Sequence, residues 1–264
     1  MEQATRELTS ALAFWLEAGV DLAYADEPQD RLKPTPRNPP PAAARLAPPV
    51  GAGAAPPPDI SAAVAAAHAL AAGAETLDQL AEAIAAFEGC PLKRMGARQS
   101  VFSRGRGDAP VMVIGEGPGA DEDKQGAPFV GRAGQLLDRM LEAAGLSDQV
   151  FITNTVFWRP PDNRTPTPQE QSVCAPFVER AIALVRPRLL LLAGGASAKA
   201  MLKRSEGILT LRGQWCEWSS SDGALVLPAM PTLHPAFLLR QPLGKKKAWQ
   251  DLMTLALRLE ETRP

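Results

Sequence analysis

The residues whose types could do chemistry lie beside glycine-rich or proline-rich turns. The clearest stretch is residues 111–131, where the apolar run VMVI leads into the turn GEGPG, which contains Glu116 and Gly117, and then into an acidic cluster that contains Glu122. Glycines let a backbone approach a ligand closely and point N–H groups toward it. A strand that runs into a glycine-rich loop holding carboxylates is typical of the ligand-binding edge of an α/β sheet.

Three further apolar runs end in polar or glycine-containing sequence. Residues 150–152 lead to Asn154, residues 189–192 lead to a Gly-Gly pair, and residues 225–233 lead to His234. Because α/β sheets bind ligands at the carboxyl ends of their strands, we expect a carboxylate, an amide and an imidazole to share one site.

Each of these residues also has an ordinary structural interpretation. Asn154 could cap a turn, Phe129 could be a core residue, and His234 could be a satisfied loop histidine. Glycine turns are common, and the three lysines at residues 245–247 could be the solvated start of a helix. The joint placement of these residues, more than any one of them, favours a functional site.

Helical patterns alternate with the four apolar runs. They cover residues 131–144, 168–185, 196–203 and 244–259. Strands separated by helices predict right-handed crossovers and a mainly parallel sheet covered on both faces. Pro228 and Pro231 predict that the fourth strand lies at a sheet edge or carries a bend.

Composition excludes several classes of protein. The chain has 264 residues, is 45% hydrophobic, and carries a formal net charge of −1. The overall charge therefore does not indicate a polyanion binder, but bases gather in residues 92–108 and 234–264. An odd count of three cysteines argues against a disulfide framework. With no signal peptide or membrane-length apolar run, we expect a cytoplasmic protein that makes no membrane contact.

The N-terminal part differs from the rest. Residues 1–26 contain an amphipathic helical pattern at 8–20, and residues 27–60 are dominated by proline and alanine, which is typical of a linker. We expect a domain over residues 61–264 with a helical lead-in at 61–90. The N-terminal helix could bind a partner protein or fold back on the domain.

Three motifs in order carry a resemblance to a known family. GEGPGADED followed by FVG, ITN followed by RPPDNR, and HPAFLLRQP followed by lysines together resemble the uracil-DNA glycosylase superfamily. The match is most similar to family 4, the iron–sulfur type, and covers about residues 90–259. It implies a three-layer α/β/α sandwich around a four-stranded parallel sheet, and an enzyme of base excision repair that acts as a monomer on uracil-containing DNA.

The resemblance also implies roles for the site residues. A base must be flipped out of the duplex before it can be cut, and the enzyme must then stabilise the departing uracil anion and supply water. Asn154 matches the amide that reads uracil, Phe129 the ring stacked on it, and His234 the donor to uracil O2. The remaining pocket positions are Glu116, the first choice for water handling, Glu122 and Asn163 as its supports, and Gly117 beside the base.

DNA contacts follow from the third motif. Leu238 matches the leucine that wedges into the base stack as the nucleotide leaves. Basic residues downstream are placed to bind flanking phosphates, which gives sequence-independent affinity. These residues are Arg240, Lys245, Lys246 and Lys247.

The sequence departs from the family at the iron–sulfur cluster. Family 4 holds a [4Fe–4S] cluster on four cysteines, and this chain keeps Cys90 and Cys174 at the first and fourth positions. Lys93 and Trp158 stand at the other two. Because thiolates supply all four ligands of such clusters, we expect no cofactor, with Trp158 packed where the cluster would lie and the two thiols reduced, partly buried and close together.

Two other functions stay open at this point. The protein could recognise uracil or abasic DNA without turnover, with the N-terminal extension as its partner module. It could also be a glycosylase for another deaminated base. The combination of Glu116, Asn154 and His234 favours catalysis, and Asn154 favours uracil.

Overall fold

A computed structural model describes residues 60–262 of the chain. The predicted helix at residues 8–20 and the predicted linker at 27–60 lie outside the described residues, apart from Ile60. Among residues 60–262, no helix is long and apolar enough to cross a membrane.

One six-stranded mixed sheet forms the centre of the domain, in the order β1-β3-β2-β4-β6-β5. The four inner strands are parallel to one another, as predicted, because each is a continuous apolar run that can be buried on both faces. The two outer strands are antiparallel additions that were not predicted. The strands are β1 (Ser103–Gly105), β2 (Val111–Gly115), β3 (Val150–Asn154), β4 (Leu189–Ala193), β5 (Cys216–Ser219) and β6 (Val226–Thr232).

The proline-containing strand β6 is not at the edge of the sheet, contrary to one of the two placements predicted for it. It lies between β4 and β5. Pro228 is in register only with β5, and Pro231 only with β4. Each proline therefore has a paired strand on one side alone, which is why its missing N–H is tolerated in an interior strand.

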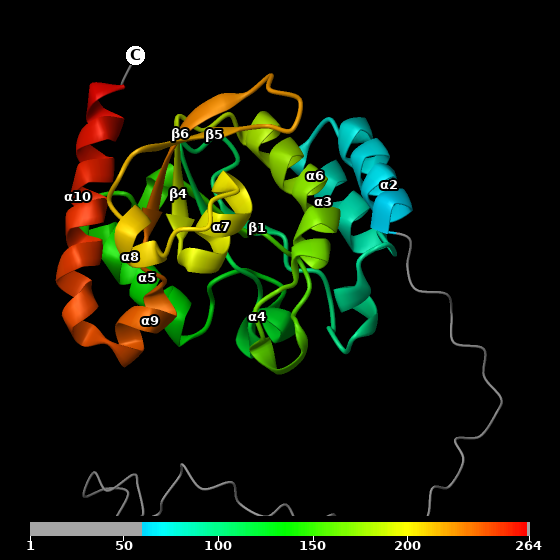
Figure 1. The fold of residues 1–264 in the computed structure, drawn as a ribbon, viewed down its shortest axis with the longest axis horizontal. Coiled ribbons are helices and arrows are strands. Elements are labelled where there is room, and N and C mark those ends of the chain that lie inside the picture. The colour runs from blue at the N-terminus through cyan, green and yellow to red at the C-terminus, as the bar shows by residue number, and fades with distance from the viewer. Residues whose placement is uncertain (1–59, 263–264) are drawn as a thin grey trace, which may run out of the picture. The chain divides into compact units, whose positions relative to one another are not determined.

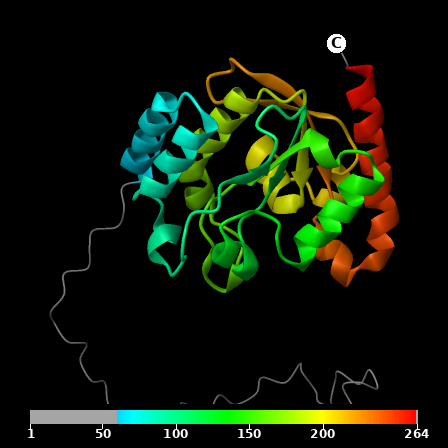
Figure 2. The same ribbon diagram turned by 180° about the vertical axis from the view of Figure 1, so that it is seen from behind.

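Helices cover both faces of the sheet, which gives the predicted three layers (Figures 1 and 2). Met112 and Ile114 face the side where α2, α3, α6 and α7 pack, whereas Val111 and Val113 face α5 and α10. The helices are α2 (Ile60–Gly73), α3 (Leu77–Ala86), α4 (Ala120–Gln125), α5 (Arg132–Ala143), α6 (Pro168–Val185), α7 (Gly195–Leu202), α8 (Ile208–Leu211), α9 (Pro235–Arg240) and α10 (Lys245–Glu261), with short 3-10 turns η1 (Pro91–Arg94), η2 (Ser147–Gln149), η3 (Pro161–Asn163) and η4 (Pro242–Gly244).

The lead-in packs onto α6 through a group of aromatic rings. Trp158 is buried, with 1% of its surface exposed, and its ring lies 6.4 Å from that of Phe87 and 6.2 Å from that of Phe157. Beside these rings, the sulfur atoms of Cys90 and Cys174 are 3.9 Å apart. The predicted packing of Trp158 and the predicted proximity of the two thiols are confirmed, but both cysteines are fully buried and not partly so.

Replacing Trp158 with alanine should lower the free energy of unfolding by about 3–5 kcal/mol, because it leaves a large cavity among rings that cannot close around it. Urea denaturation measures this change. Trp249→Ala is the matched control, since its indole is 40% exposed and its loss should cost far less. Equal effects of the two variants would contradict the structural role of Trp158.

Candidate active site

A pocket of about 470 Å³ opens beside the carboxyl ends of the inner strands. It contains every residue that the sequence predicted for catalysis and for uracil binding: Glu116, Gly117, Glu122, Phe129, Asn154, Asn163 and His234. Arg240, predicted to contact DNA, also lines it. Residues far apart in the sequence are brought together because parallel strands end at the same edge.

The strand ends approach closely at Gly115, the last residue of β2. It is in register with Asn154, the last residue of β3. A Cβ atom at Gly115 would lie 2.5 Å from Cζ of Phe129 and would also clash with the Asn154 carboxamide. Only glycine therefore lets the amide and the ring meet at the floor of the pocket.

Asn154 is 2% exposed, and its side chain faces this pocket. No residue in the described part of the chain hydrogen-bonds its carboxamide. Its oxygen and its NH₂ group are therefore available to a ligand as one acceptor and two donors.

Phe129 stands beside His234, with ring centroids 5.7 Å apart and planes inclined by 29°. The backbone of Phe129 is left-handed, with φ of 55°, which is rare for a bulky residue. Arg104 holds the segment by donating from Nε to the carbonyl of Pro128 at 2.8 Å and from Nη2 to that of Phe129 at 3.3 Å. Such a conformation persists only where surrounding contacts determine it, and it commonly marks functional sites.

The two pocket glutamates differ in what they contact. Glu122 accepts three backbone hydrogen bonds, from Val130 at 3.0 Å, Gly131 at 2.9 Å and Gly119 at 3.1 Å. Its carboxylate thus holds the loop that carries Phe129. The carboxylate of Glu116 has no hydrogen-bond partner among residues 60–262 and faces the pocket, so it is the glutamate free to act on a ligand or on water.

His234 caps the N-terminus of α9, where its Nδ1 accepts a hydrogen bond from the backbone N–H of Ala236 at 3.1 Å. In the neutral ring the proton must therefore be on Nε2, which can donate. Burial lowers the pKa of His234 to about 4, with a further lowering from Arg240 and an opposing effect of Glu122. The imidazole is a neutral hydrogen-bond donor at physiological pH.

Asn163 lies at the exposed rim of the pocket, in η3. Its Oδ1 accepts from Nε of Arg159 at 2.8 Å. The sequence predictions missed its neighbours Arg164, Thr165 and Pro166, which also line the pocket. The motif RPPDNR was the available signal, because it already placed Asn163 at this wall.

The residues predicted to contact DNA separate into two groups. Arg240 and the three lysines at 245–247 are exposed, and the lysines occupy the first turn of α10. Leu238, the predicted wedge, is fully buried against Leu136, Leu233 and Ala248. Its side chain packs on the inward face of α9 and does not reach the surface in this structure.

The family's cluster positions do not fit an iron–sulfur cluster. Within residues 60–262 there is no group of three or more histidine, cysteine, aspartate or glutamate side chains that could hold a metal ion. Lys93 turns its amine to the carbonyls of Ala85 at 2.7 Å and Phe87 at 3.2 Å. Trp158 supplies a packed ring, so two thiols are the whole donor set.

Fold and pocket together define an α/β protein whose pocket carries amide, carboxylate and imidazole groups and is also lined by Arg164 and Arg240. The family model of the uracil DNA glycosylase superfamily matches residues 102–253. The chain belongs to this superfamily, and its similarity to type-4 relatives places it in family 4.

Three type-4 uracil-DNA glycosylases illustrate the similarity. That of Pyrobaculum aerophilum is 38% identical, with 67% of this chain and 91% of the relative aligned. That of Thermotoga maritima is 35% identical over 63% of this chain and 84% of its own length. That of Sulfurisphaera tokodaii is 35% identical over 67% and 82% respectively.

The lowered pKa of His234 has a measurable consequence. The unfolded chain should protonate this residue near its ordinary value of 6.5, whereas the folded protein should do so near 4. Between these values the unfolded state binds more protons, so the free energy of unfolding should fall as the pH falls from about 6.5 to 4.

NMR of ¹⁵N-histidine-labelled protein measures the folded value directly. His68→Gln removes the only other histidine, so the remaining signals belong to His234. We expect the ring to stay in its Nε2–H tautomer at pH 5 and to titrate near pH 4. A midpoint near 6.5 would show that the ring is solvated.

Proposed function

We propose that this protein is a DNA-repair glycosylase that flips uracil out of DNA and hydrolyses its N-glycosidic bond, leaving an abasic site. The observation that carries the proposal is the unpartnered carboxamide of Asn154, buried beside the Phe129 ring and close to a neutral His234. Its type-4 relatives support the same activity.

Base recognition falls to the pocket floor. The carboxamide of Asn154 can accept a hydrogen bond from uracil N3–H while it donates one to O4, which reads the Watson–Crick edge of the flipped base. Cytosine presents an acceptor and a donor at those two positions, so the same amide orientation mismatches it. Phe129 offers its ring face for stacking, and Gly117 lines the pocket beside the base.

Bond cleavage needs opposite charges stabilised at two places. As the glycosidic bond breaks, negative charge develops on uracil and positive charge on the sugar. His234 donates its Nε2–H toward uracil O2, and a neutral donor gains most as that oxygen becomes anionic. Glu116 stabilises the sugar cation and orients water, and Asn163 supports it from the rim of the pocket. Glu122 holds the loop that carries Phe129.

DNA binding uses the exposed cations, with Arg240 at the pocket and Lys245, Lys246 and Lys247 beyond it. Between them lies Leu243 in η4, whose side chain is 93% exposed, an unusual state for a leucine. We assign the wedge to Leu243 in place of Leu238, because an apolar side chain among phosphate-binding groups can enter the base stack and offset the cost of unstacking.

We also propose that the protein works without an iron–sulfur cluster. The two remaining thiols are in contact with each other, and the other two ligand positions are used for an amine anchor and for an indole in the core. None of the residues assigned to recognition or cleavage lies at those positions.

The first test is release of uracil from an oligonucleotide, detected by alkali cleavage at the abasic site. The wild-type protein should turn over, whereas His234→Ala should bind DNA but cut at least about 10²-fold more slowly, because it loses a donor used mainly in the transition state. Asn154→Asp should also lose activity on uracil, since a carboxylate cannot donate to O4. A wild-type protein that binds uracil-DNA without cutting it would favour a non-catalytic reader.

The wedge can be assigned by two leucine variants. Leu243→Ala should slow excision several-fold or more from double-stranded DNA and much less from single-stranded DNA, where no base pair must be opened. Leu238→Ala should instead lower the free energy of unfolding by about 2–5 kcal/mol, because it empties a buried site. Unchanged duplex activity in Leu243→Ala would return the role to another residue.

Metal analysis after anaerobic purification tests the absence of a cluster. We expect a colourless protein with far less than one iron per chain and activity that survives chelators. About four irons per chain with matching sulfide would contradict this, since a [4Fe–4S] cluster needs that stoichiometry.

A further inference from the structure

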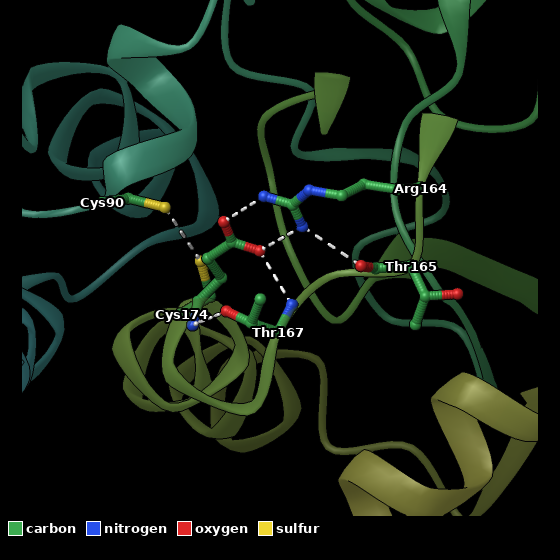
Figure 3. Close-up of polar contacts among 6 residues, drawn as sticks. Cys90, Arg164, Thr165, Thr167 and Cys174 are labelled. Atoms are coloured by element: carbon green, nitrogen blue, oxygen red, sulfur yellow. Dashed lines mark hydrogen bonds and ion pairs between the residues drawn. The ribbon is translucent and has the colours of Figure 1, made fainter. Parts of the chain in front are cut away.

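A buried carboxylate on α6 has no place in the reaction described above. Glu170 is 4% exposed and forms a two-pronged ion pair with Arg164: Nη2 donates to Oε1 at 2.6 Å and Nη1 to Oε2 at 2.8 Å. The backbone N–H of Thr167 donates to the same Oε2 at 2.8 Å. Figure 3 shows Arg164 reaching from the loop toward the helix that carries Cys174.

This ion pair joins the helix to one wall of the pocket. Residues 160–166 form that wall, and Arg164, Thr165 and Pro166 line the pocket directly. Arg164 also donates from Nη1 to the carbonyl of Thr165 at 3.1 Å. One guanidinium therefore fixes both the wall and its own neighbour against α6.

The wall needs such support because its backbone is strained. Asp162 and Asn163 are consecutive non-glycine residues in the left-handed region, with φ of 53° and 52°. Aspartate and asparagine tolerate this region better than most residues, but the conformation persists only when neighbouring contacts determine it. The contacts here are the bond from Arg159 to Asn163 and the ion pair from Arg164 to Glu170.

Glu170 anchors this ion pair on α6, and the helix is itself packed firmly at this point. Cys174 lies one turn further along α6, fully buried, with its sulfur 3.9 Å from that of Cys90. Burial alone would raise the pKa of Glu170, but the bonds from Arg164 and Thr167 outweigh it and leave the pKa lowered. The carboxylate therefore stays ionised at neutral pH and remains paired with the guanidinium of Arg164.

We propose that Glu170 is a positioning residue for uracil excision: through Arg164 it holds the strained wall at residues 160–166 so that Asn163 faces the reacting sugar. This role rests on the proposed glycosylase activity. Glu170 contacts neither base nor sugar, and acts only by limiting the movement of the wall. Displacement of a positioned group by even about 1 Å can lower a rate by up to about 10².

Glu170→Gln is the test variant, because it keeps the shape and removes the charge. Its single-turnover rate on saturating uracil-DNA should fall about tenfold or more, while the Kd for the same DNA changes by less than about threefold. Glu179→Gln is the matched control: it lies on the same helix and accepts hydrogen bonds from Ser221, away from the pocket wall. It should leave both values unchanged.

A double-mutant cycle shows whether Glu170 acts through Arg164. If it does, Arg164→Gln combined with Glu170→Gln should be no slower than the slower single variant. Arg164→Gln breaks the same ion pair at its more exposed partner, so it tests the same contact if Glu170→Gln folds poorly. Fully multiplicative losses in the double variant would overturn the coupling.

Limited trypsin digestion measures how firmly the wall is held, independently of excision activity. Cleavage after Arg164 should be faster in Glu170→Gln than in the wild type or Glu179→Gln. Equal digestion and equal excision rates would overturn the inference while leaving the glycosylase activity intact. A wild-type protein that releases no uracil would instead refute the proposed function, and the positioning role with it.

Discussion

The site depends on how closely the ends of β2 and β3 approach each other. Gly115 and Asn154 face each other across the parallel register, and the absence of a side chain at Gly115 lets both the carboxamide and the Phe129 ring occupy the same small space. Everything else in the pocket is arranged around this contact. Glu122 holds the Phe129 loop by three backbone N–H groups, and Arg104 holds its carbonyls. The strain at Phe129 is thus compensated by polar contacts that the reaction itself does not use.

The sequence predicted the inner sheet well because buried parallel strands are continuous apolar runs, and the residues after them must share one edge. It did not predict β1 or β5, since strands of three and four residues are too short for their residue pattern to give a clear signal. The order of Glu116 before Glu122 came from the resemblance and not from the residues themselves, because the difference lies in backbone N–H groups from residues 119–131 that come together only in the folded loop. Leu238 shows the same limit. Whether a leucine in a six-residue helix faces the core or the solvent depends on neighbours such as Leu136 on another helix.

The residues at the family's cluster positions are held by packing and by polar contacts. Lys93 does not leave a buried charge among the thiols. Its amine reaches the last carbonyls of α3, where a cation is favoured by the helix dipole and by unpaired oxygens, and it also pairs with Glu88 at 2.6 Å. Trp158 meanwhile joins the rings of Phe87 and Phe157. The lead-in, the loop after β3 and α6 are therefore held together by an apolar core and a capped helix end.

A second buried carboxylate forms a comparable ion pair elsewhere in the domain. Asp251 on α10 is 1% exposed; it accepts from Thr232 at 2.7 Å and pairs with Arg212, which also donates to the carbonyl of Lys247 at 2.7 Å. Burial raises the pKa of Asp251 despite these bonds. Thr232 ends β6 two residues before His234, so one carboxylate fixes the start of the lysine-bearing helix relative to His234. Buried ion pairs add little net stability, because desolvation offsets their attraction, but they penalise every arrangement in which they are broken. Glu170 with Arg164 and Asp251 with Arg212 therefore act on geometry: the first pair holds the loop at residues 160–166 against α6, and the second holds α10 against the end of β6.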